Sequence, residues 1–280
     1  MPSPIRLPYF DVLLSLLEQG NPALEQTFGN HVHWGYWPDP AAADRSPEDF
    51  SAAAEALSRL VYQAAGVADG MRVLDAGCGF GGTTASMNKA FEHVAITGLN
   101  IDPRQLGRAQ SRLHPRPGNR VDWIQADACS LPFPDESFDA MLAVECIFHF
   151  PNRERFFREA FRVLKPGGRL ALSDFLPIGM FKPILRLAAL WPATVGFYGH
   201  CNMRYNQRDY HRLAADTGFA VSHEHDITAN TLPTYDFIRE LAKALTMPSV
   251  SAAAETLSAE WVSRLGVLRY VVMGFEKPER

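Results

Sequence analysis

The sequence predicts an α/β protein built on one mainly parallel β-sheet with helices on both faces. Three observations lead to this prediction. The chain has 280 residues, of which 47% are hydrophobic, enough for one large domain with a substantial core. From residue 71, short β-type runs alternate with runs of helical periodicity, as in successive βαβ units. A glycine-rich turn separates the first of these strands from the helix that follows.

Two helices are predicted before the alternating region. The first spans about Tyr9–Leu17 and is interrupted by Asp11, so it reads as an amphipathic helix rather than an export signal. We expect it to pack on the body of the protein, and a flap over a ligand is the alternative. The second begins after Ser46, which is followed by proline and two acids, and runs to about Ala65.

The alternating region is predicted to hold seven strands: Arg72–Ala76, Val94–Leu99, Val121–Gln125, Asp139–Val144, Arg169–Asp174, Ala220–His225 and Leu268–Phe275. The predicted helices between them are Thr83–Phe91, Pro103–Leu113, Arg153–Leu164 and Gln207–Thr217. The third of these helices is the best marked, because Asn152 can cap it and the run 165–168, Lys-Pro-Gly-Gly, ends it.

The chain is expected to form a single domain, 1–280, in which a core alternates with cap segments. The predicted core comprises 66–175, 206–227 and 267–276. Three remaining segments are too long for plain connections: an N-terminal helical piece and two insertions, at 1–65, 176–205 and 228–266. We expect them to cover the carboxyl edge of the sheet, which is where open α/β sheets bind ligands.

Charge and composition exclude several classes of protein. The net charge of −4 provides no positive field for a nucleic-acid backbone. No apolar run approaches the ~18–20 residues of a membrane span. Cysteine spacing indicates neither a disulfide framework nor a zinc site, so we expect reduced thiols and a cytoplasmic location. His223 and His225 share a strand face without a third ligand nearby, and no metal site is expected.

The glycine-rich turn carries the chemistry. Its glycines, Gly77, Gly79 and Gly81, let a ligand approach the backbone and the following helix N-terminus. A dinucleotide site has a similar turn, spaced G-x-G-x-x-G, so a nicotinamide-dependent oxidoreductase is one alternative. However, the spacing here is tighter, and Asp75 at the strand end would repel a pyrophosphate. A carboxylate there suits a ligand with a cationic amino group.

With this turn and three further motifs in order, the chain resembles the class I S-adenosylmethionine-dependent methyltransferases of the small-molecule branch. The further motifs are 98–102 with Gln105, 125–128, and 131–139 together with 162–168. The likeness is strong over about residues 70–175 and loose elsewhere. It implies a Rossmann-like seven-stranded methyltransferase fold with an antiparallel last strand and a helical cap. A subunit of this fold without catalysis is a further alternative.

The resemblance also implies where S-adenosylmethionine binds. The 75–82 loop would cradle its amino-acid end. Asn100 would meet the ribose where the family usually has an acid, a pattern shared with sterol C-methyltransferases, and Asp102 is the alternative. Asp127 would accept from the adenine amino group, unless it only caps a turn. The full set of expected cofactor residues is Tyr36, Asp75, Gly77, Gly79, Gly81, Asn100, Ile101, Gln105, Asp127 and Ala128.

For catalysis the sequence points to His149 and Glu145, which follow the fourth strand beside the expected position of the methyl group. His149 is the candidate general base for a hydroxyl acceptor, and a structural role is the alternative. Methylation of an isoprenoid-like alkene, with Glu145 and His149 stabilising a cation or removing a proton, competes with oxygen methylation, and a nitrogen acceptor stays open. Aromatic residues that could line the pocket predict an apolar acceptor from secondary metabolism, and a homodimer is possible. These residues are Phe148, Phe150, Phe175, Phe181, Trp191, Phe197, Tyr198 and Tyr205.

Overall fold

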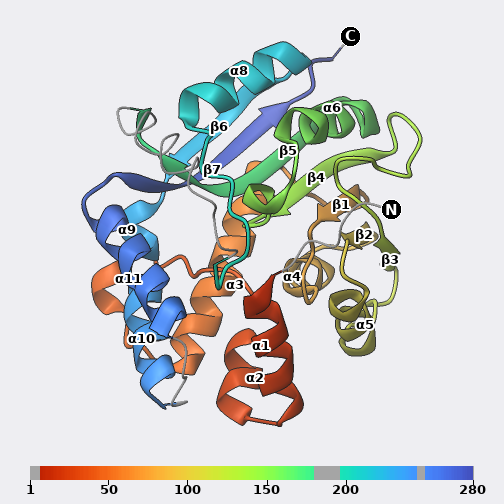
Figure 1. The fold of residues 1–280 in the computed structure, drawn as a ribbon. Coiled ribbons are helices and arrows are strands. Elements are labelled where there is room, and N and C mark those ends of the chain that lie inside the picture. The colour runs from red at the N-terminus through yellow and green to blue at the C-terminus, as the bar shows by residue number, and fades with distance from the viewer. Residues whose placement is uncertain (1–6, 180–195, 245–249, 280) are drawn as a thin grey trace.

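A computed structural model describes residues 7–179, 196–244 and 250–279 of the chain (Figure 1). Its centre is a seven-stranded sheet in the order β3-β2-β1-β4-β5-β7-β6. Strand β7 runs antiparallel to both β5 and β6, and the pairs among β1 to β5 are parallel. The predicted fold class is therefore confirmed. The strands are β1 Arg72–Ala76, β2 Ala95–Asn100, β3 Arg120–Gln125, β4 Phe138–Val144, β5 Leu164–Pro177, β6 Ala220–Asp226 and β7 Leu268–Glu276.

The helices follow the predicted positions closely along the core. The described α-helices are α1 Pro8–Glu18, α2 Pro22–Phe28, α3 Pro47–Ala64, α4 Gly82–Ala90, α5 Pro103–Arg112, α6 Arg153–Val163, α8 Gln207–Thr217, α9 Thr228–Thr231, α10 Pro233–Ala244 and α11 Val250–Arg264, with short 3-10 turns η1 Pro40–Ala42 and η2 Ile147–His149. Helix α2 is absent from the sequence prediction. It begins with Asn21, whose side chain accepts from the backbone N–H groups of Ala23 and Leu24.

Strand β5 begins five residues earlier than predicted. The run after α6 was expected to be a loop, but Leu164 pairs with Phe138 before a bulge shifts the register to Ala140 and Arg169. Proline and glycine in this run are tolerated because a bulge leaves ladder positions unpaired.

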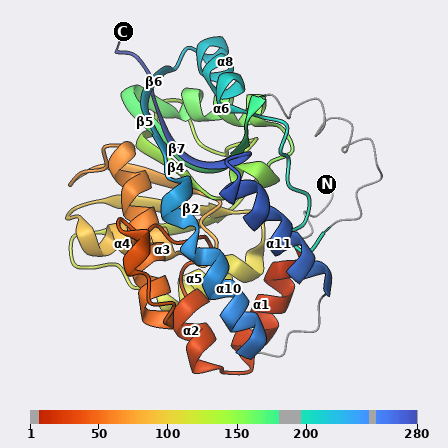
Figure 2. The ribbon, with the colours of Figure 1, turned by 90° about the vertical axis from the view of Figure 1, so that its left-hand side faces the viewer.

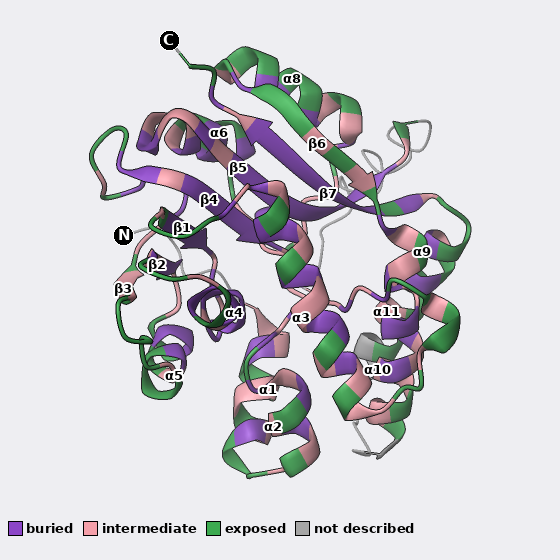
Figure 3. Ribbon diagram, turned by 180° about the vertical axis from the view of Figure 1, so that it is seen from behind, coloured by how far each residue is buried: buried purple, intermediate pink, exposed green. Residues whose placement is uncertain are grey.

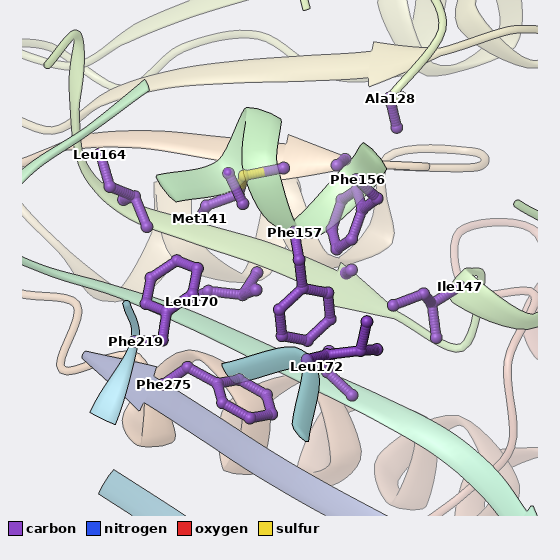
Figure 4. Packing of buried hydrophobic residues seen from close by; sticks show 14 of the residues in the cluster. Ala128, Met141, Ile147, Phe156, Phe157, Leu164, Leu170, Leu172, Phe219 and Phe275 are labelled. Carbon is purple, nitrogen blue, oxygen red and sulfur yellow. The ribbon is translucent and has the colours of Figure 1, made fainter. Parts of the chain in front are cut away.

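Apolar side chains are buried on both faces of the sheet, as expected for parallel strands between helices. One cluster lies between the sheet and helices α6 and α8, where Phe156, Phe157 and Phe275 pack together (Figure 4). A second cluster lies on the opposite face under α3 and α4, and includes Leu57 and Met87. Figure 3 shows the central strands as the most continuously buried part of the chain.

A buried ion pair joins the start of α6 to β5. Arg153 and Asp174 are both inaccessible to solvent, and Arg153 Nη1 lies 2.8 Å from Asp174 Oδ2. The hydroxyl of Tyr210 donates to the same oxygen at 2.5 Å. Arg153 Nη2 also donates to the carbonyl of Asn202 at 2.8 Å, which attaches the segment before α8 to the core.

Helices α1, α2, α10 and α11 gather together at one end of the sheet (Figures 1 and 2). Apolar side chains hold them there: Phe50 stacks on Phe237 of α10, and Phe10 of α1 packs against Phe80 of the glycine-rich loop. Part of the predicted 176–205 insertion, residues 180–195, lies outside the described residues. Within the described residues, none of the helices has the length and hydropathy that crossing a membrane requires.

Candidate active site

Two adjoining cavities lie at the carboxyl edge of the parallel strands. The first has a volume of about 90 Å³ and is lined by the loop after β1, the ends of β2 and β4, the segment after β3, and the start of α1. The second, of about 530 Å³, is mostly apolar and lies among α1, α10 and α11. Five residues line both cavities: Tyr9, Val32, His33, Glu145 and His149.

The glycine-rich loop forms one wall of the first cavity. Gly77, Gly79 and Gly81 all have positive φ, and a Cβ on Gly77 would lie 2.7 Å from Cys146 Sγ. Asp75 at the end of β1 is buried and accepts from the Thr84 hydroxyl at 2.7 Å. Burial raises the pKa of Asp75 to about 6, so it is ionised at neutral pH. This carboxylate can hold an ammonium group. Gly81 does not line the cavity but precedes α4.

At the end of β2, Asn100 and Gln105 form a buried amide pair. Asn100 Nδ2 donates to Gln105 Oε1 at 3.0 Å, and both residues line the first cavity. Asp102, the alternative, instead caps α5 by accepting from the Arg104 N–H and forms an ion pair with that side chain. The remaining amide hydrogens of the Asn100–Gln105 pair can serve the hydroxyls of a ribose.

The residues that the family resemblance assigns to the adenine also lie at the first cavity. Ile101, Asp127 and Ala128 all line it. Asp127 Oδ1 also accepts from the Cys129 N–H at 2.8 Å. The turn-capping role and the position in the cavity therefore coexist in one side chain.

Tyr36 lies apart from the other predicted cofactor residues. It lines neither cavity; its N–H donates to the Ala53 carbonyl at 2.8 Å and its ring lies 6.5 Å from that of His225. The residues of the N-terminal segment that do line the first cavity are Leu7, Tyr9, Phe10, Asn30, His31, Val32 and His33. Sequence reasoning missed most of these, because only packing brings α1 over the glycine-rich loop. One available signal was the first predicted helix, for which a flap over a ligand is the alternative interpretation.

Glu145 occupies a strained position directly after β4. Its φ of 49° is unusual for a residue with a side chain and costs about 1–3 kcal/mol. The surroundings hold it there: its N–H donates to Ser173 Oγ at 3.0 Å, and Oε2 accepts from the Trp34 N–H at 3.0 Å and the Tyr270 hydroxyl at 2.5 Å. Burial raises the pKa of Glu145 to about 8 despite these donors.

His149 ends the short η2 turn that follows Glu145. Its Nδ1 lies 3.4 Å from the carbonyl of His200, which can only accept, so the proton belongs on Nδ1 and Nε2 carries the lone pair. Burial lowers the pKa of His149 to about 4. The ring lies 6.1 Å from that of Tyr9, centroid to centroid.

The predicted aromatic residues of the cap divide between several places. Phe148, Phe175, Phe197 and Tyr198 line the second cavity, and Phe150 lines the first. Tyr205 instead covers the buried Arg153 guanidinium, 4.5 Å from ring centroid to Cζ. The other two predicted residues, Phe181 and Trp191, lie outside the described residues.

No group of three or more metal-ligating side chains occurs among the residues that the structure describes. The His223 and His225 rings are 6.2 Å apart, and the buried Nε2 of His223 has no partner among the described residues.

The side chains of the first cavity offer a carboxylate for an ammonium, amides for hydroxyls and an apolar face for a heterocycle. This donor set fits S-adenosylmethionine.

Comparison with known proteins agrees with this geometry. Residues 74–172 match the methyltransferase domain family. The chain is 31% identical over 253 residues to the methyltransferase GfsG of Streptomyces halstedii, covering 88% of this chain and 84% of that protein. It is 41% identical over 157 residues to the 27-O-demethylrifamycin SV methyltransferase of Amycolatopsis mediterranei, covering 55% of this chain and 54% of that protein.

Solved structures share the fold at lower identity. Geranyl diphosphate C-methyltransferase from Streptomyces coelicolor A3(2), solved with Mg²⁺, geranyl diphosphate and S-adenosyl-L-homocysteine, superposes with a TM-score of 0.71 at 19% identity and 99% coverage of both chains. The [4+2]-cyclase SpnF gives a TM-score of 0.72 at 24% identity, with 98% of this chain and 94% of that chain covered. On sequence, fold and the donor set of the cavity together, the chain belongs to the class I methyltransferases and is an enzyme that uses S-adenosylmethionine.

Proposed function

We propose that this enzyme methylates a small, apolar molecule of secondary metabolism, bound in the larger cavity while the cofactor occupies the smaller one. The observation that supports this most directly is that Glu145 and His149 line both cavities. A methyl group passing from one cavity to the other would travel past these two side chains. One of the relatives named above, whose name makes it a methyltransferase of 27-O-demethylrifamycin SV, supports an acceptor of this kind.

Bound S-adenosylmethionine supplies an electrophilic methyl group on a positively charged sulfur. The chain's own residues have three tasks in such a transfer: aligning the acceptor, excluding water, and removing a proton when the acceptor is a hydroxyl. Apolar walls of the second cavity, including Phe148, Phe175 and Tyr198, would serve the first two tasks. In our proposal the 75–82 loop, the Asn100–Gln105 pair and the 127–128 turn hold the cofactor.

Two bases are available for the proton. His149 is the base expected from the sequence, and its free Nε2 lone pair suits that role. Its pKa of about 4 makes it a weak proton acceptor, however, whereas a carboxyl group with a pKa near 8 is mostly protonated at neutral pH and becomes a stronger base as the pH rises through about 8. We therefore favour Glu145 as the group that takes the proton, with His149 orienting the acceptor hydroxyl.

Carbon methylation of an isoprenoid-like alkene is the second candidate. It is favoured by the same pair, because at mildly basic pH an ionised Glu145 can stabilise a carbocation and then remove its proton. The rings of Tyr9, which lines both cavities, and of Tyr198, which packs near it in the second cavity, would also stabilise a cation.

The test supplies methyl-labelled S-adenosylmethionine with 2-naphthol, an apolar hydroxyl, or squalene, an alkene without one. We expect methyl label in the extracted naphthol. The rate of labelling should fall roughly 10²-fold or more in Glu145→Gln and by a smaller factor in His149→Ala. Glu92→Gln, on an exposed loop, is the matched control. Label in squalene alone would favour carbon methylation. Label in neither probe, with S-adenosylhomocysteine binding intact, would refute an apolar acceptor of either kind.

A further inference from the structure

Tyr9 lines both cavities, and its hydroxyl has no hydrogen-bond partner among the residues that the structure describes. The other two tyrosines of the second cavity differ in this respect. The Tyr198 hydroxyl lies 2.8 Å from Thr256 Oγ1, and the Tyr235 hydroxyl lies 3.0 Å from Ser263 Oγ. Of these three hydroxyls, the one on Tyr9 is therefore available to a ligand.

Neighbouring groups hold Tyr9 in this position. Its N–H donates to the Phe197 carbonyl at 3.0 Å, and its ring lies 6.1 Å from the ring of His149, with 25° between the two planes. In the described part of the chain, the fully enclosed polar side-chain atoms without a partner belong to Arg153 and His223. The Tyr9 hydroxyl is not one of them, so it borders open space.

The other side chains that line both cavities offer a ligand no free donor. Val32 is apolar, and both ring nitrogens of His33 lie within 3.0 Å of other groups of the chain. Glu145 in its basic form can only accept, and the Nε2 of His149 carries a lone pair. Among these five side chains, Tyr9 is the one that can donate a hydrogen bond to a ligand at the junction of the cavities.

A hydroxyl acceptor needs such a donor, because its oxygen carries one proton and two lone pairs. During transfer, one lone pair forms the bond to the methyl carbon while the carbon–sulfur bond breaks and its electrons return to sulfur. The proton passes to Glu145. The second lone pair remains, and negative charge develops on the oxygen as the proton leaves. A hydrogen bond donated to this lone pair therefore strengthens along the reaction.

We propose that the Tyr9 hydroxyl recognises the acceptor by donating a hydrogen bond to the oxygen that is to be methylated, an inference that rests on the proposed function. Burial and the charge of Glu145 raise the pKa of Tyr9 well above its ordinary value, so the hydroxyl keeps its proton at neutral and mildly basic pH. An alkene has no lone pair for this bond. Tyr9 therefore selects hydroxyl acceptors over alkenes.

The test compares three ligands with one ring system: 2-naphthol, naphthalene, and 2-methoxynaphthalene, which keeps the oxygen but not its proton. Each is titrated into the complex with S-adenosylhomocysteine, and binding is followed by the ligand's fluorescence. Tyr9→Phe should weaken 2-naphthol and 2-methoxynaphthalene about 5-fold and leave naphthalene within about 2-fold, because a hydrogen bond between neutral groups is worth roughly that factor. Tyr36→Phe alters a tyrosine that lines neither cavity and should change none of the three.

Tyr9→Phe removes no hydrogen bond within the described chain, so the variant should fold. Equal weakening of all three ligands would mean that Tyr9 is only an apolar wall, and unchanged affinities would mean that its hydroxyl is not used. A loss confined to 2-naphthol would mean that Tyr9 accepts rather than donates. Each of these results would overturn the inference and leave the apolar acceptor in place. If the unmodified protein binds S-adenosylhomocysteine but none of the three ligands, the apolar acceptor itself is refuted, and the inference with it.

Discussion

Replacing Asp174 with Asn should destabilise the protein far more than the loss of one hydrogen bond. Asp174 and Arg153 are both fully buried, and the variant leaves the Arg153 guanidinium without its counter-charge. Removing one partner of such a pair costs about 3–5 kcal/mol. Three neutral contacts of Arg153 remain, with Tyr210, Asn202 and the Tyr205 ring, and they do not replace a charge.

The measurement is urea unfolding followed by circular dichroism, in which the midpoint should fall by roughly 1–2 M. Asp122→Asn is the matched control. Asp122 forms an equally short ion pair with Arg120, 2.7 Å, but the side chains are 44% and 75% exposed, so the cost should be about 0–1 kcal/mol. Midpoints of the two variants that agree within about 0.3 M would contradict the cost of leaving the buried guanidinium without its counter-charge. The double variant Arg153→Met with Asp174→Leu should recover most of the loss.

Three further predictions concern the cavities. Tyr270→Phe removes a donor to Glu145, so the pKa of that carboxyl should rise further above about 8. Infrared difference spectroscopy should then show the carboxyl titrating with a midpoint at higher pH, and an unchanged midpoint would contradict the hydrogen bond. Gly82→Ala places a Cβ against a buried imidazole and should lower both the melting temperature and S-adenosylhomocysteine affinity, whereas Gly107→Ala, with open space around it in helix α5, should stabilise the protein slightly. S-adenosylhomocysteine affinity should fall as the pH drops through about 6, where Asp75 gains a proton, and Asp75→Asn should bind weakly at every pH; a flat profile for the unmodified protein would argue against that role.

Local sequence patterns were sufficient to predict most of the strands and helices of the core. Strand β1 and helix α8 match their predicted bounds residue for residue, because a run of buried apolar residues and a capping Asn206 mark them in the sequence. The glycine-rich loop and Asp75 were predictable for the same reason: the turn itself requires those residues. Their positions in the cavity follow from the strand order.

The remaining features depend on contacts between distant segments. Within residues 20–29, Asn21 followed by Pro22 is a helix-start signal, but a seven-residue helix is too short to be stable alone and depends on its packing against α3. His31 contacts Glu55, which is 24 residues away in the sequence, at 3.2 Å between Nε2 and Oε2. Tyr36 was expected at the cofactor from family likeness, yet Tyr9 and Phe10 line the first cavity instead. Only the folded chain brings such residues together.

Three successive residues at the start of α1 touch three different walls. Tyr9 lines both cavities, Phe10 packs on Phe80 of the glycine-rich loop, and Asp11 forms an ion pair with Arg104 of α5. Residues adjacent in the sequence thus contact the glycine-rich loop, helix α5 and the wall shared by the two cavities, so a displacement of this helix would change both cavities together.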